Sequence, residues 1–141
     1  MKKYDWKLIL TLSLPGPVMG VLTLYGIIPF GIERWFWLTI SIVAAVVIAR
    51  GVKSHAFGHG AIVGFLLGAS AIFIKAAWSE LYAANNPALL QKLSGATGGP
   101  EFQYRMLMLV PFIGLSNALL VGLMSFFTFK AMRGQNQEAN N

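Results

Sequence analysis

The side chain best placed to do chemistry in this sequence is Lys75, a single charge well inside a long apolar stretch. Ionisable side chains are costly within a bilayer, so such a residue is by default a candidate for a substrate or proton pathway. Lys75 also lies only about two helical turns before the end of its stretch. A structural role, or extension of its side chain to the membrane surface, is therefore the simpler expectation.

Asn117 is a polar side chain at similar depth in another apolar stretch. Hydrogen bonding between helices is its simplest role, with the loosened backbone around Pro15 and Pro17 as one partner. Those two prolines flank Gly16 inside the first apolar stretch, where each removes a backbone donor and predicts a kink. Broken helices form substrate sites in transporters, so Lys75, Asn117, Pro15 and Pro17 are the candidates for a transport path.

His55 and His59 are four residues apart, as two metal-binding histidines on one helical face would be. Gly58 interrupts the pair, and no cysteine or carboxylate accompanies it. Two ligands do not complete a metal site, so we expect an interfacial role and no metal, although the spacing leaves metal binding open.

Enzyme motifs are missing from the sequence. It contains no GxSxG, phosphate-binding loop, dinucleotide-binding glycine pattern or HExxH. With no cysteine, thiol catalysis and iron–sulfur centres are also excluded. We therefore expect no enzyme activity, no catalytic residue and no cofactor.

The composition is that of an integral membrane protein. Of 141 residues, 56% are hydrophobic and only 11% are charged, whereas soluble domains carry about 25% charged residues. The net charge of +6 would suit a nucleic-acid partner, but no basic run is interleaved with aromatic residues. The length indicates a single domain.

Four segments are apolar enough to cross a bilayer, which takes about 20 residues. They cover residues 8–28, 35–49, 61–81 and 106–129, and residues 82–105 form one external loop. The first segment continues past Val21 without a small-residue cleavage site, so it is expected to be a retained helix and not a secretory signal. The sequence thus predicts an all-α bundle of four transmembrane helices.

The basic residues predict the orientation of these spans. Lys and Arg are concentrated on the cytoplasmic side of membrane proteins. The side of the two termini carries seven of them: Lys2, Lys3, Lys7, Arg50, Lys53, Lys130 and Arg133. The opposite side carries three: Arg34, Lys92 and Arg105. Both termini are therefore predicted to be cytoplasmic.

Small residues at every fourth position predict close helix packing. Such stripes let backbones approach, which drives helix association in lipid. The stripes include Gly60, Gly64 and Gly68 in the third span and Gly114 and Gly122 in the fourth. Packing within the chain is the simpler expectation for the Gly60 stripe, and a dimerisation face is the alternative.

Several short motifs resemble those of a family of small bacterial four-helix inner-membrane proteins of unknown function. They are Arg50 and Lys53 in a basic loop, Phe57-Gly58, the GFLLG of residues 64–68, the Asn-Pro-x-Leu of residues 86–89, and Lys130. The resemblance implies a bacterial inner-membrane location. It implies no activity and no functional residues.

Two functions fit these features. The first is a non-enzymatic accessory or structural membrane protein that packs against another membrane protein or against a second copy, in a lipid bilayer and without nucleic acid. The alternative is a small homo-oligomeric transporter or channel, with Lys75 and Asn117 near the path and the first helix kinked by proline. One chain of four helices has little room for a pore, so the alternative requires oligomerisation.

Overall fold

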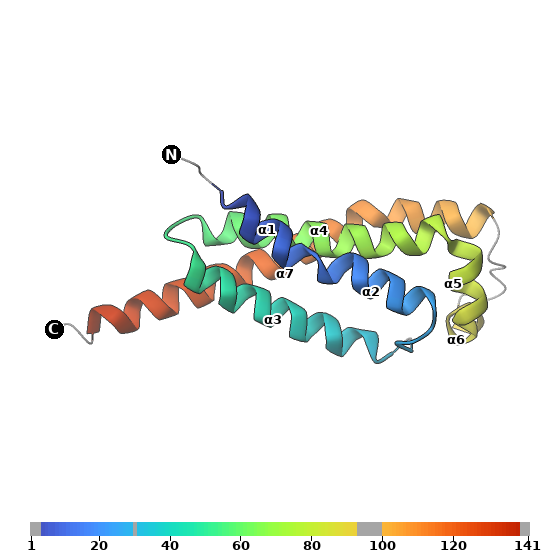
Figure 1. The fold of residues 1–141 in the computed structure, drawn as a ribbon, viewed down its shortest axis with the longest axis horizontal. Coiled ribbons are helices and arrows are strands. Elements are labelled where there is room, and N and C mark those ends of the chain that lie inside the picture. The colour runs from blue at the N-terminus through green and yellow to red at the C-terminus, as the bar shows by residue number, and fades with distance from the viewer. Residues whose placement is uncertain (1–3, 30, 93–99, 139–141) are drawn as a thin grey trace.

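The computed structural model describes residues 4–29, 31–92 and 100–138, and all regular secondary structure in them is helical (Figure 1). Apolar segments in lipid must satisfy their backbone hydrogen bonds internally, which favours helices. The helices of the described residues are α1 (Trp6–Ser13), α2 (Pro15–Leu24), α3 (Glu33–Gly51), α4 (Ala56–Ala77), α5 (Ser79–Asn85), α6 (Pro87–Lys92) and α7 (Pro100–Glu138).

Four helical segments are long and apolar enough to cross a membrane. They are Trp6–Leu24, which joins α1 and α2, then Glu33–Gly51, Ala56–Ala77 and Pro100–Gly134. Large apolar side chains lie exposed along their outer faces, among them Leu14, Val43 and Phe73. Lipid would cover such surface, so these helices suggest an integral membrane protein.

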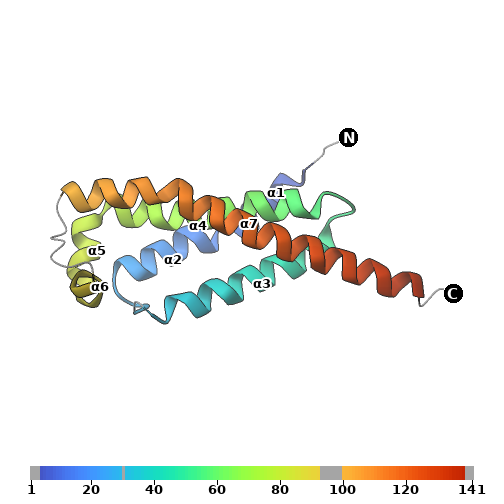
Figure 2. The same cartoon turned by 180° about the vertical axis from the view of Figure 1, so that it is seen from behind.

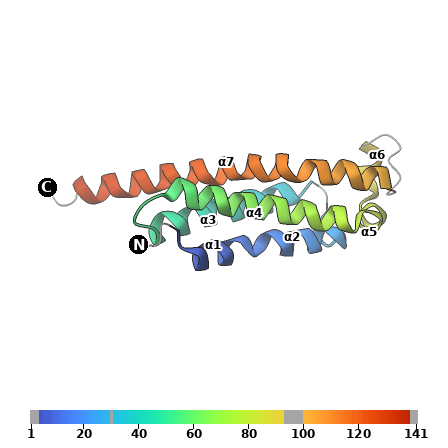
Figure 3. The same cartoon turned by 90° about the horizontal axis from the view of Figure 1, so that it is seen from above.

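Helix α4 lies at the centre of the arrangement. It packs against α7 along most of its length and against α1 and α2 on another side, while α3 contacts both α7 and α4. The start of α1, the end of α7 and the α3–α4 connection lie together at one end, here called the termini end (Figure 1). Helices α5 and α6 close the opposite end, the α5 end, and α7 projects beyond the other helices at the termini end (Figures 2 and 3).

Glycines explain why α4 can occupy this position. The Gly60, Gly64 and Gly68 stripe of α4 faces α7, where a Cβ would meet backbone and side-chain atoms of residues 113–125. On another side of α4, Gly16 and Gly20 of α2 lie against Leu67 and Ala71. The predicted small-residue stripe is therefore used for packing within the chain.

The two prolines of the first span divide it into α1 and α2. Because Pro15 has no N–H, the carbonyl of Thr11 accepts a 3.4 Å hydrogen bond from the backbone N–H of Leu14 instead. Leu14 keeps helical backbone angles, with φ −56° and ψ −37°. The prolines thus produce a local break without an unwound segment.

The observed helix limits differ from the predicted spans of 8–28, 35–49, 61–81 and 106–129. The first span ends at Leu24, because a turn with Gly26 at φ +68° follows. The third ends at Ala77, since Trp78 leaves the helical region at φ −118° and ψ 47°. The second begins at Glu33, two residues earlier than predicted.

The predicted external loop of residues 82–105 is largely helical. Its first part continues α5, α6 begins at Pro87, and α7 already starts at Pro100 and continues to Glu138. Proline suits the first turn of a helix, where its missing N–H would have no partner, so both prolines begin helices. Lys2 and Lys3, and residues 93–99 of this loop, lie outside the described residues.

We predict that Gly64→Ala lowers the free energy of unfolding by about 1–3 kcal/mol, as overpacking does. The added Cβ would overlap the backbone carbonyl of Asn117, which cannot move without shifting α7. Thermal unfolding in detergent measures the change. Gly134→Ala is the control, because nothing lies within 4 Å of its added Cβ. Equal stability of the two variants would contradict the packing described here.

Candidate functional site

An open cavity of about 710 Å³ lies between α3, α4 and α7 and reaches α5 and α6 at the α5 end. Most of its wall is apolar, with side chains such as Leu38, Ile72 and Leu109. Its polar lining residues are Glu33, Arg34, Ser41, Lys75, Tyr82 and Asn117. Ligand pockets commonly combine such a wall with a few polar groups, and their volumes are about 300–1,000 Å³.

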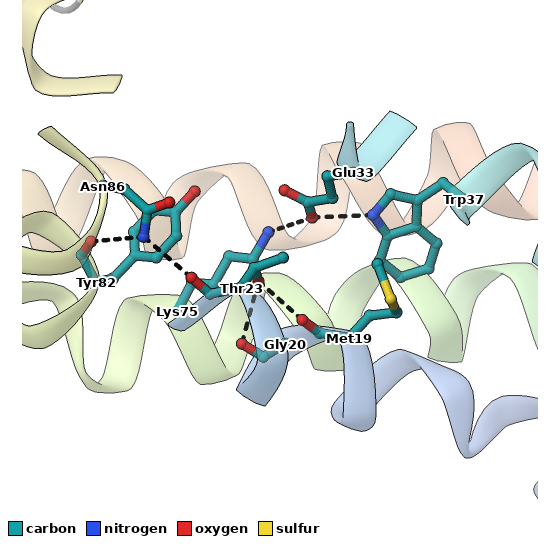
Figure 4. A network of polar contacts seen from close by, with 8 residues as sticks. All are labelled: Met19, Gly20, Thr23, Glu33, Trp37, Lys75, Tyr82 and Asn86. Carbon is teal, nitrogen blue, oxygen red and sulfur yellow. Dashed lines mark hydrogen bonds and ion pairs between the residues drawn. The ribbon is translucent and has the colours of Figure 1, made fainter. Parts of the chain in front are cut away.

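An ion pair joins α4 to α3 at the α5 end of the cavity. Lys75 Nζ lies 2.5 Å from Glu33 Oε1, and the two side chains are only 4% and 14% exposed. The indole Nε1–H of Trp37, one turn further along α3, donates to the same oxygen at 3.0 Å. Figure 4 shows Glu33 between these two donors. One carboxylate thus orients a lysine and a tryptophan from two helices.

Tyr82 of α5 lies beside this pair. Lys75 Nζ lies 5.4 Å from the centroid of its ring, a distance at which a cation is attracted to the aromatic face. Burial and, to a smaller extent, the negative charge of Glu33 raise the pKa of the Tyr82 hydroxyl above its ordinary value. The hydroxyl therefore remains protonated and can donate a hydrogen bond.

Two asparagines hold α5, and with it Tyr82, against the end of α2. The Asn86 side-chain amide donates to the carbonyls of Thr23 at 3.0 Å and of Tyr82 at 2.9 Å (Figure 4). The Asn85 amide donates to the carbonyl of Leu24 at 3.1 Å. The last carbonyls of a helix lack partners within it, so these amides serve as a C-terminal cap supplied by another helix.

Lys75 and Asn117 line the same cavity, but the two prolines of the predicted path do not. Lys75 is 3% exposed and paired with Glu33, so of the two roles expected for it the structural one fits this arrangement, and its side chain does not extend freely outward. Pro15 borders a separate hollow between the first span and α3. The structure therefore brings together half of the predicted transport set.

Asn117 lies on the face of α7 that contacts α4, where its amide nitrogen would touch a Cβ on Gly68. Its side chain makes no hydrogen bond with any residue that the structure describes, so the expected bond to the first span is absent there. The reason is geometric, because α4 separates α7 from α2.

His59 connects the start of α1 to α4 at the termini end. Its Nε2 accepts the backbone N–H of Asp5 at 3.0 Å, and its Nδ1 lies 2.9 Å from the carbonyl of His55. This pattern requires a neutral ring with the proton on Nδ1. Within residues 4–29, 31–92 and 100–138, no three His, Cys, Asp or Glu side chains gather in a group that could hold a metal ion.

Glu33, Trp37 and Tyr82 are site residues that the sequence analysis did not select. A signal for Glu33 was present, because a lysine inside a span requires a counter-ion at its own depth. Glu33 stands at the start of the preceding span, at the α5 end where Lys75 also lies, and it is the acidic residue in the first turn of α3. Tyr82 depends on the bend at Trp78, which local sequence does not specify.

No family model, curated protein or solved structure matches the chain. The resemblance to small bacterial inner-membrane proteins consequently has no support from these comparisons. The function is therefore inferred from the site itself.

We predict that Lys75→Met lowers the free energy of unfolding by about 3–5 kcal/mol, because it leaves the Glu33 carboxylate buried without its partner. Thermal or denaturant unfolding in detergent measures this loss. Arg105→Met is the control, since Arg105 and Glu101 form an exposed pair whose side chains are 69% and 81% accessible. Removal of an exposed pair has little effect. Similar, small losses in both variants would contradict a structural role for the buried pair.

Proposed function

We propose that this protein is a non-enzymatic accessory protein of a bacterial inner membrane, which packs against another membrane protein or a second copy. In this proposal its long helices form a four-helix transmembrane bundle with both termini in the cytoplasm. The distribution of basic residues supports the orientation. The start of α1, the α3–α4 connection and the end of α7, which lie at the termini end, carry Lys7, Arg50, Lys53, Lys130 and Arg133. The starts of α3 and α7, which lie at the α5 end, carry Arg34 and Arg105.

The exposed length of α7 is the observation that carries the accessory role. Of the 18-residue apolar window within Pro100–Gly134, only 22% is buried, although the helix has 39 residues. Large apolar side chains recur on its outer face at spacings of four, three and four residues: Met108, Phe112, Leu115 and Leu119, each at least 58% exposed. These four side chains form one face of α7, which a partner helix could bury by packing along it.

Several ionisable side chains that the structure describes are engaged in contacts within the chain. Lys75 and Glu33 form an ion pair with each other, and both ring nitrogens of His59 take part in hydrogen bonds with the backbone. A general base or nucleophile needs a group that is free to exchange a proton or to attack a substrate. These arrangements support a function by binding.

A small homo-oligomeric transporter or channel is the alternative, and one observation favours it: Lys75 and Asn117 line one cavity. The lining runs from Glu33 and Tyr82 at the α5 end to Ser41 and Leu120 in the middle of α3 and α7. A path across the whole membrane would need further surface from a second copy. The accessory role does not require a second copy to complete a path across the membrane, so we prefer it.

Cysteine cross-linking in native membranes tests the accessory role, since the natural chain has no cysteine. We expect Leu115→Cys, labelled with a maleimide that carries a photoreactive benzophenone, to give one covalent adduct of defined mass, because this side chain lies in the proposed α7 interface. Leu14→Cys is the matched control: both leucines lie near mid-span, and they are 62% and 61% exposed. An adduct with a second copy or with one foreign membrane protein identifies the partner. Identical adduct patterns from both positions, or none from Leu115→Cys, would refute the proposed interface.

A further inference from the structure

The α5 end of the cavity holds several polar groups with unused hydrogen-bonding capacity. Lys75 has three N–H donors, and Glu33 Oε1 is the one acceptor bonded to them among the described residues. The Tyr82 hydroxyl makes no hydrogen bond with any described residue, although Tyr82 is only 3% exposed and lines the cavity. Both residues border the cavity, so a ligand held there can supply the acceptor that the described residues do not provide.

We propose that the cavity binds a lipid-soluble molecule with a neutral carbonyl group at the end of an apolar tail. Its carbonyl oxygen would accept hydrogen bonds from Lys75 Nζ and the Tyr82 hydroxyl. Its tail would lie along the apolar wall toward Ile113 and Leu120. This site is separate from the proposed α7 interface, so either proposal can fail without the other.

The charges at this end favour a neutral carbonyl over an ionised group. Lys75 and Glu33 cancel, and Arg34, the third charged lining residue, is exposed, with its guanidinium 5.5 Å from the centroid of the Trp35 ring. A carboxylate or ammonium added beside the buried pair would therefore be a net charge in surroundings of low polarity, which is costly. The unused donors call for an acceptor, and the protonated state of Tyr82 preserves one of them. A carbonyl oxygen has two lone pairs and can accept from both residues.

The rest of the cavity favours an apolar tail. Between the polar cluster and Asn117, its wall consists of side chains such as Leu38, Ile72, Leu109 and Ile113. A volume of about 710 Å³ falls within the range of pockets that hold small ligands. Membrane quinones and lipid esters both combine a neutral carbonyl with a long tail, and they are the two sources of this chemistry.

Titration calorimetry of the full chain in a maltoside detergent tests the proposal with three probes. Decyl-substituted benzoquinone and methyl laurate carry carbonyl groups, whereas decylbenzene has a ring and tail without one. We expect at least one carbonyl probe to saturate a single site per chain, and the tighter of the two identifies the source. Tyr82→Phe should weaken that binding about fivefold, as expected for one lost neutral hydrogen bond, and should leave decylbenzene unchanged.

Two further variants make the result specific. Tyr104→Phe is the matched control, because Tyr104 is 66% exposed and does not line the cavity, and its carbonyl binding should equal that of the wild type. Leu109→Trp should weaken all three probes by filling the tail region, and it keeps the test decisive if Tyr82→Phe fails to fold. The proposal is overturned if neither carbonyl probe saturates a site, or if a folded Tyr82→Phe binds them as tightly as the wild type.

Discussion

The ion pair between Lys75 and Glu33 fixes how α3 meets α4 at the α5 end. Neither charge can remain alone among buried apolar side chains, because an unpaired ion there costs several kcal/mol. The pair therefore holds the start of α3 beside the end of α4, while Trp37 donates to the same carboxylate. The cavity between α3, α4 and α7 has its polar end at this junction. Lys75 keeps unused N–H donors at this junction, because the Glu33 carboxylate accepts only part of its hydrogen-bonding capacity.

Close packing of α4 supplies the rigid frame around that pair. Glycines on α4 allow the backbone of α7 to approach closely, and Gly16 and Gly20 of α2 allow the same close approach of the α4 backbone. Neither contact leaves room for a side chain, so the three helices have little freedom to slide. Asn86 then ties α5 to the end of α2 and brings Tyr82 over Lys75. Packing and hydrogen bonding thus position each polar group that borders the cavity.

Much of the fold could be predicted from periodicity and hydropathy, whereas only part of the site could. The four apolar segments correspond to four helices of membrane-spanning length, and Pro15 and Pro17 mark the observed break. Lys75 and Asn117 were selected as polar groups at depth, and both border the cavity. Glu33 was missed because its partner is 42 residues away, and Tyr82 because a bend outside regular helix places it. Span limits shifted where tertiary contacts, such as the Asn85 and Asn86 cap, ended a helix that hydropathy would continue.

A double-mutant cycle on Glu33→Gln and Lys75→Met tests most directly whether this pair organises the structure. The free energies of unfolding of the wild type, both single variants and the double variant are compared in one detergent. We predict that the double variant loses at least about 2 kcal/mol less than the two single losses combined, since it leaves no buried charge unpaired. Losses that add to within about 0.5 kcal/mol would show that the two side chains act independently, which would contradict the account.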